Sequence, residues 1–220
     1  SPAAANPVKT AEQMVVVVTP EWKAAQGEMR LYERRKGHWV QHGKSIPIVV
    51  GRKGMAWGIG IMAAGEGNTK DEGDEKAPAG LFSIPMVFGA EPMKTGMPFR
   101  LLQPGMTCVD DPQSKAYNRI VDAGHPRDWK SGEDLSALYA FGLVVGHNIR
   151  YRERRRGSCI FLHPWRSASA GTLGCTGVEE GALRNVISWL SAAKNPLMVQ
   201  LPAPLYQEYQ PIWGFPPWSP

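Results

Sequence analysis

The 220-residue chain predicts a mainly β domain, a sandwich or barrel with long loops and one helix. Short apolar runs rich in β-branched residues recur along it, as in this fold class. The 24 glycines and 19 prolines, roughly a fifth of the residues, indicate many turns and exclude a helical bundle. A hydrophobic content of 43% with 20% charged residues excludes an intrinsically disordered chain and allows a sizeable core.

The predicted strands follow one another from the amino end of the chain. Each is a short apolar run bounded by turn residues. Residues 29–32 and 39–40 form a hairpin, and the turn at 51–54 closes the strand before it. The Gly-rich polar stretch 65–80 is predicted as a long surface loop. The remaining runs are residues 14–18, 46–50, 81–84, 119–121, 141–147 and 158–163.

One helix is predicted directly after Cys175. Acidic residues occupy its first turn, which suits the positive end of the helix dipole, and Asn195-Pro196 stops it. Its apolar residues recur at helical spacing, namely Val178, Leu183, Val186, Ile187 and Leu190. Residues 203–220 are rich in Pro and aromatic residues and are expected to lie along the domain surface. The predicted domain organisation is an extension at 1–13, a single domain at 14–202 and this carboxyl-terminal segment.

Charge and hydropathy narrow the class of protein. The net charge of +5 suits an acidic polymer as partner without choosing one. No apolar run approaches the roughly 20 residues that a membrane-spanning helix needs. The arginines cluster locally and no recognition motif accompanies them, so nucleic acid is not an expected partner. The chain starts on a small, polar segment without Met, which fits an exported protein whose signal peptide has been removed.

Chemistry concentrates in residues 158–178. A strand ending at His163 is followed by a loop of small residues and then by Gly-Thr-Leu-Gly-Cys175. A cysteine at a helix start has a lowered thiol pKa, and the N–H groups of Gly174 and Cys175 can bind an oxyanion. His163 is 12 residues upstream of Cys175, close enough to act as its base. On spacing alone, a buried structural cysteine and a core histidine remain the competing interpretation.

The three cysteines leave at least one unpaired. Cys159 and His163 are expected to share one face of a strand. Cys108 and Cys159 can form a disulfide, which would leave Cys175 free, but the sequence does not establish the distance that a disulfide needs. Two buried thiols are the preferred prediction.

The segment that contains His163 and Cys175, together with other parts of the chain, resembles the YkuD-type L,D-transpeptidases of bacterial cell-wall synthesis. The segment GSCIFLH…GTLGC is similar to the family's active-site motif, and three further blocks occur in family order, GRKGMAWG, EGDEKAPAGLFSI and CVDDPQSKAYNRIVD. The resemblance spans about residues 14–202. Many members carry Ser-His-Gly-Cys, whereas this chain has Thr172-Leu173-Gly174-Cys175, and its His-to-Cys loop is short. In these two features the chain resembles a proteobacterial branch of the family.

The resemblance implies the roles of individual residues. Cys175 matches the family's nucleophile, His163 matches its base, and the Pro164 carbonyl matches the oxygen that orients the imidazole, while Gly174 belongs to the oxyanion site. We expect further contacts to substrate from Arg166, which can bind a substrate carboxylate, and from Thr172, Trp165, Tyr117, Asn118 and His147. For most of these residues a purely structural role is the alternative.

The resemblance also implies a function. It predicts a periplasmic enzyme that forms peptidoglycan crosslinks through a Cys175 thioester, joining third positions of two stem peptides or a first to a third. No metal or cofactor is expected. Stem peptides are the expected donor and acceptor, a carbapenem is an expected covalent ligand, and the chain is expected to be a monomer. Two alternatives stay open, an L,D-carboxypeptidase that trims stems and a catalytically silent cell-wall binding module.

Overall fold

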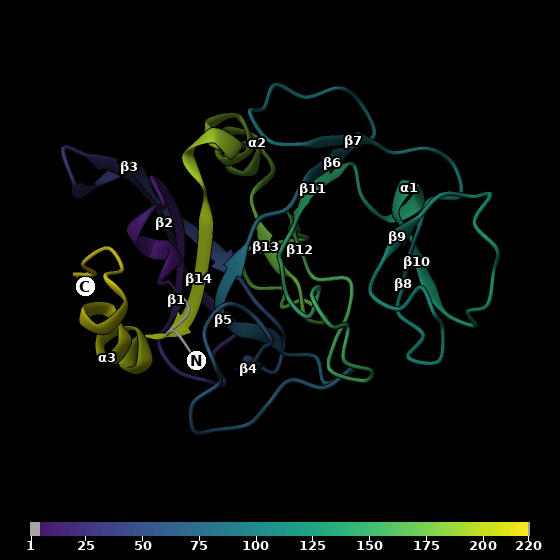
Figure 1. Cartoon of the computed structure of the whole chain (residues 1–220), viewed down its shortest axis with the longest axis horizontal. Coiled ribbons are helices and arrows are strands. Elements are labelled where there is room, and N and C mark those ends of the chain that lie inside the picture. The colour runs from purple at the N-terminus through teal and green to yellow at the C-terminus, as the bar shows by residue number, and fades with distance from the viewer. Residues whose placement is uncertain (1–4, 220) are drawn as a thin grey trace.

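A computed structural model describes residues 5–219 and contains two sheets (Figure 1). The larger has eleven strands in the order β4-β5-β14-β1-β2-β3-β13-β12-β11-β6-β7, and the smaller has the order β10-β8-β9. This confirms the predicted mainly β fold. The strands are β1 (Gln13–Thr19), β2 (Gln26–Arg35), β3 (His38–Val49), β4 (Met55–Trp57), β5 (Ala77–Ser83), β6 (Val87–Gly89), β7 (Phe99–Leu101), β8 (Thr107–Val109), β9 (Ile120–Val121), β10 (Gly132–Asp134), β11 (Phe141–Val144), β12 (Phe161–Pro164), β13 (Thr176–Val178) and β14 (Leu197–Pro202). The helices are η1 (Pro7–Lys9), α1 (Leu135–Leu138), α2 (Glu180–Trp189), η2 (Ala192–Lys194) and α3 (Ala203–Trp213).

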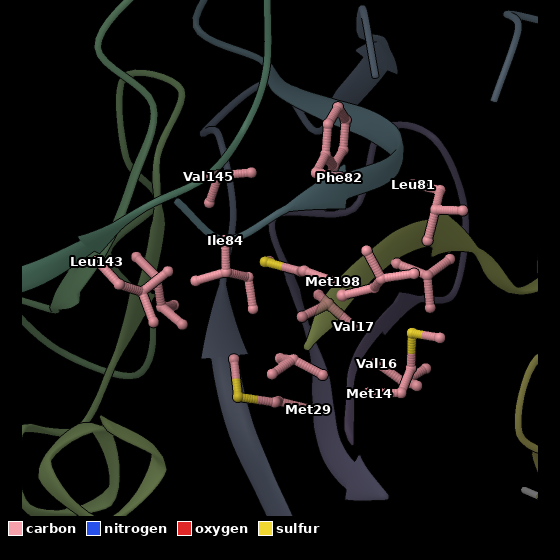
Figure 2. Close-up of a cluster of buried hydrophobic side chains, with 14 of the residues drawn as sticks. Met14, Val16, Val17, Met29, Leu81, Phe82, Ile84, Leu143, Val145 and Met198 are labelled. Atoms are coloured by element: carbon pink, nitrogen blue, oxygen red, sulfur yellow. The ribbon is translucent and has the colours of Figure 1, made fainter. Parts of the chain in front are cut away.

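The core is built around β14 and β1, the third and fourth strands in the order of the large sheet, which pair in parallel. Every residue of both strands is buried, as expected of strands that are covered on two faces. On one side lies α3, which contacts both strands. Figure 2 shows side chains from distant segments meeting around β1, including Met29, Phe82, Leu143 and Met198. Burial of these apolar side chains is the main stabilising contribution to the fold.

The predicted hairpin corresponds to β2 and β3. Lys36 and Gly37 connect them, and both have positive φ angles, +49° and +81°. A two-residue turn of this kind matches the twist of the strands that it joins. The runs predicted at 39–40 and 46–50 belong to one continuous strand, β3, whose pairing with β2 shifts between Met29 and Leu31. The predicted loop at 65–80 is shorter than expected, because β5 already begins at Ala77.

The helix predicted directly after Cys175 begins later. Residues 176–178 form β13, which pairs with β12 on one side and β3 on the other, and α2 begins only at Glu180. Val178 matches the helical spacing of the apolar residues, yet its backbone is in the sheet. The Glu179 side chain caps α2 by accepting hydrogen bonds from the N–H groups of Gly181 and Ala182. Cys175 is therefore not at a helix N-terminus.

The carboxyl-terminal segment packs against the β2–β3 hairpin, and its helix α3 was missed by the sequence prediction. After α3, Gly214 adopts a left-handed conformation, with φ of +77°, and reverses the chain. Phe215 is then buried against Tyr206, and Trp218 lies under the Arg30 guanidinium. This segment covers the edge of the hydrophobic core.

A disulfide joins the small sheet to the segment before β12. Cys108 in β8 is bonded to Cys159, 51 residues further along the chain. The preferred prediction of two buried thiols was therefore wrong. Cys159 also lies outside β12 with a φ of +56°, so the alternation argument that placed it on the same face as His163 does not apply. Both cysteines are buried in one apolar cluster together with Cys175.

We expect the Cys108→Ala, Cys159→Ala double variant to lose stability, because the disulfide restricts the unfolded chain over a long loop. Chain-entropy arguments give a decrease of roughly 4 kcal/mol in the free energy of unfolding for a loop of this length. Urea denaturation followed by tryptophan fluorescence measures it. Cys175→Ala, which leaves the disulfide intact, is the control, and equal midpoints for the double variant and the wild type would contradict the prediction.

Candidate active site

Cys175 is held in the short segment that leads into β13. Its side chain is 8% exposed. The Phe161 N–H donates a hydrogen bond to Sγ at 3.3 Å, and the thiol donates to the Cys159 carbonyl at 3.4 Å. The second contact links the thiol to the disulfide, since Cys159 provides both the acceptor and one half of the bridge.

The environment of the thiol favours its protonated form. Burial raises the pKa of Cys175 to about 12, and the Glu133 carboxylate adds to this increase. The Phe161 N–H and the Lys70 ammonium oppose it. Removing a charge from water disfavours the thiolate, and no helix N-terminus is present to compensate. The predicted low thiol pKa was therefore wrong, because β13 separates Cys175 from α2.

His163 is arranged as a neutral base. The Nδ1–H of the ring donates to the Pro164 carbonyl at 2.7 Å, the contact that the family resemblance implied. This bond leaves the lone pair on Nε2. Burial lowers the pKa of His163, so the imidazole is uncharged at neutral pH. The side chain is partly exposed, and its ring lies 5.2 Å from that of Tyr139, centroid to centroid.

The pairing of β12 with β13 sets the positions of the two residues relative to each other. In this parallel pair His163 lies opposite Gly177, two positions beyond Cys175. A Cβ at Gly177 would lie 3.0 Å from Trp165 Cβ and 2.9 Å from Val49 Cγ2, so glycine allows the three strands to approach here.

Thr172 and Gly174 shape the loop before the cysteine. The Thr172 hydroxyl donates to the Cys175 carbonyl at 2.5 Å and accepts from the Gly174 N–H at 3.1 Å. Gly174 has a φ of +150°, which side-chain-bearing residues rarely adopt. The Thr172 backbone is fixed by hydrogen bonds to Val50 and Arg52. The Gly174 N–H therefore donates its hydrogen bond to Thr172. The Thr172 hydroxyl bonds to the backbone of its own loop and holds that loop in shape.

The predicted substrate-binding residues divide into two groups. Trp165 is partly exposed and Arg166 is exposed, both just after His163, and Arg166 forms no ion pair with any described residue. Tyr117, Asn118 and His147 are different, because their polar atoms bind other parts of the protein.

His147 is enclosed, with 1% of its surface exposed. Its Nδ1 accepts from the Ile59 N–H and its Nε2 bonds to the Arg156 carbonyl, and burial lowers its pKa to about 3. The Asn118 amide bonds to the backbones of His147, Asn148 and Cys159. Tyr117, 2% exposed, donates to Glu72 at 2.5 Å. The polar atoms of these three side chains are thus engaged by the protein itself, and their contact with substrate stays a prediction.

Two residues beside the thiol were missed by the sequence analysis. Tyr139 packs against both Phe161 and His163, and its hydroxyl donates to Glu133 Oε2 at 2.9 Å. Glu133 comes from β10 in the small sheet, opposite Cys108. No motif marks either residue, because only the packing of the small sheet against the large one brings them to Cys175.

A thiol held next to a strand that presents a neutral imidazole is an arrangement typical of enzymes with a cysteine nucleophile. Among the described residues, no cluster of His, Cys, Asp and Glu side chains is suited to a metal ion. No helix in residues 5–219 has the length and apolar character to cross a membrane. The family model YkuD, the L,D-transpeptidase catalytic domain, matches residues 14–199, so the chain belongs to this family. No curated protein and no solved structure matches it significantly.

We expect alkylation of Cys175 by iodoacetamide to accelerate with pH well beyond pH 9, because only the thiolate reacts and the pKa of this thiol is raised to about 12. Each pH unit below that pKa should change the rate about tenfold, as the thiolate fraction does. Intact mass measured over time gives the rate. Cys175→Ser should gain no mass, and a rate that levels off below pH 8 would contradict the prediction.

Proposed function

We propose that this protein is a cysteine-dependent L,D-transpeptidase that crosslinks peptidoglycan stem peptides in the periplasm. The observation that carries the proposal is the Nδ1–H bond of His163 to Pro164, which leaves Nε2 as a base on the strand that pairs with the segment after Cys175, the only described cysteine outside a disulfide. Membership of the L,D-transpeptidase family supplies the substrate class. We further propose that residues 14–202 form the catalytic domain and that the protein acts as a monomer.

In the first half-reaction the Cys175 sulfur attacks the carbonyl that follows an L-centre of the donor stem. Because thiol and imidazole are both neutral at rest, the S–H proton moves to His163 Nε2 as the C–S bond forms. Backbone N–H groups stabilise the oxyanion. The Cys175 N–H is the better candidate, since Thr172 already engages Gly174. His163 then protonates the departing amine, and a thioester remains.

In the second half-reaction an acceptor attacks the thioester. An amine of a neighbouring stem gives a crosslink, between two third positions or between a first and a third, whereas water gives a trimmed stem and makes the enzyme a carboxypeptidase. Trp165 and Arg166 follow His163 at the protein surface, where an aromatic face and a guanidinium can bind the stem and its carboxylates. A carbapenem, which carries a strained acyl group, would report on thioester formation as a mass increase on Cys175.

We expect Cys175→Ala to abolish both crosslinking and trimming, and His163→Ala to reduce turnover by 10²-fold or more, since general-base catalysis contributes on this scale. The assay is mass spectrometry of disaccharide-tetrapeptide after incubation with protein. A dimer shows transpeptidation and its fragmentation locates the bond, while a shortened monomer alone shows carboxypeptidase activity.

The acid limb of the pH profile provides a second test of His163. Its pKa is lowered, so the basic form persists to a pH below the usual value and turnover should fall only as the pH drops through that lowered pKa.

Retained activity in Cys175→Ala would refute the mechanism. Unchanged substrate in the presence of the wild type would favour the cell-wall binding module.

A further inference from the structure

One ionisable group beside the nucleophile has no part in the mechanism above. Glu133 is partly exposed and lies opposite Cys108, whose disulfide partner Cys159 accepts the hydrogen bond of the Cys175 thiol. Its carboxylate adds to the effect of burial in raising the thiol pKa. That charge works against the nucleophile, because it disfavours the thiolate on which attack depends. A carboxylate in this place therefore calls for a function other than activation of sulfur.

Glu133 is fixed in position by Tyr139. The Tyr139 hydroxyl donates to Oε2, while the same ring packs on His163 and Phe161. Among residues 5–219, no donor reaches Oε1 and no cation forms an ion pair with this carboxylate. One oxygen is thus engaged by the protein and the other is left for a ligand.

The groups around Glu133 are acidic. Asp110 and Glu72 both raise its pKa, and Asp110 Oδ1 is buried without a hydrogen-bond partner among the described residues. Glu72 accepts hydrogen bonds from Tyr117 and Ser158. Lys70, a cation that lowers the pKa of both Glu72 and Cys175, is itself bonded to Asp74 and to the Lys76 carbonyl. The charge at this side of the thiol is therefore complementary to a cation.

We propose that Glu133 binds the ammonium of the acceptor stem and takes its proton, so that the enzyme transfers the acyl group to an amine in preference to water. Tyr139 is the positioning residue, since it holds one oxygen of Glu133 beside His163 and Cys175. This inference rests on the proposed function and adds to it the group that selects the acceptor.

In this step the acceptor nitrogen loses two protons, one to Glu133 and one to His163. The Glu133 carboxylate accepts a proton from the R–NH₃⁺ acceptor, and the free amine forms a C–N bond to the thioester carbonyl. His163 takes a second proton from that nitrogen and gives it to sulfur as the C–S bond breaks. The products are the amide, the Cys175 thiol and neutral His163, and Glu133 returns its proton to solvent. Burial raises the pKa of Glu133 to about 7, which suits an acid–base group near neutral pH.

The test uses Glu133→Gln, which keeps an acceptor for the Tyr139 hydroxyl and removes the charge. Disaccharide-tetrapeptide is incubated with each protein, and mass spectrometry gives the ratio of crosslinked dimer to hydrolysed monomer. We expect this ratio to fall about 100-fold, with hydrolysis retained. Added hydroxylamine, a nucleophile that is uncharged at neutral pH, should be acylated equally well by the variant and the wild type. Glu133→Asp should recover part of the ratio, and Glu180→Gln, at an exposed carboxylate in α2, should leave it unchanged.

Two further readouts separate this role from a structural one. In the wild type the ratio of crosslinked dimer to hydrolysed monomer should rise with pH through about pH 7 as Glu133 ionises. This rise should be larger than any rise in Glu133→Gln. Iodoacetamide should alkylate Cys175 faster in Glu133→Gln above pH 8, because the carboxylate that raises the thiol pKa is gone. An unchanged ratio, or equal losses with hydroxylamine and with the stem acceptor, would overturn the inference while the proposed function stands. If the wild type forms no acyl-enzyme, the proposed function fails and the inference with it.

Discussion

The parallel pairing of β12 with β13 is the constraint on which the candidate site depends. It sets His163 opposite Gly177 and brings Phe161 level with Cys175, whose sulfur accepts the Phe161 N–H. β13 is only three residues long, yet it is held on its other side by β3, so it cannot shift without breaking the large sheet. A one-residue slip would turn every side chain of the strand to the opposite face and separate the thiol from the imidazole.

The site also depends on the small sheet, through a covalent route. Cys108 in β8 lies opposite Glu133 in β10 and is bonded to Cys159, whose carbonyl accepts the Cys175 thiol. The residues that surround the sulfur therefore come from both sheets. Tyr139 adds a second connection, because its ring packs on β12 while its hydroxyl holds β10. The disulfide therefore holds the residues around the thiol in position and also stabilises the fold.

Local pattern predicted the parts of the structure that are determined locally. The β-branched run of β1 and the Lys36-Gly37 turn carry their own conformational preferences, and spacing together with the family motif indicated His163 and Cys175 as the candidate base and nucleophile. β13 was missed because three residues with a glycine at the centre have no strand pattern of their own. Burial of His147 was missed because its partners, the Ile59 N–H and the Arg156 carbonyl, are backbone groups distant in sequence. Glu133 could not be found for the same reason, since only the contact between two sheets gives it a role.

The protein as a whole is positively charged, whereas the surroundings of Glu133 beside the thiol are acidic, and this arrangement suits the proposed reaction between two stem peptides. A net charge of +5 favours approach to an acidic polymer such as peptidoglycan, whose stem peptides carry carboxylates. At the thiol itself burial disfavours the thiolate and Glu133 adds to this effect, while Asp110 and Glu72 make the surroundings of Glu133 acidic. A site that needed only to cut a peptide bond would gain from the opposite arrangement. The acidic surroundings make sense where the second substrate arrives as an ammonium and must lose a proton before it can attack.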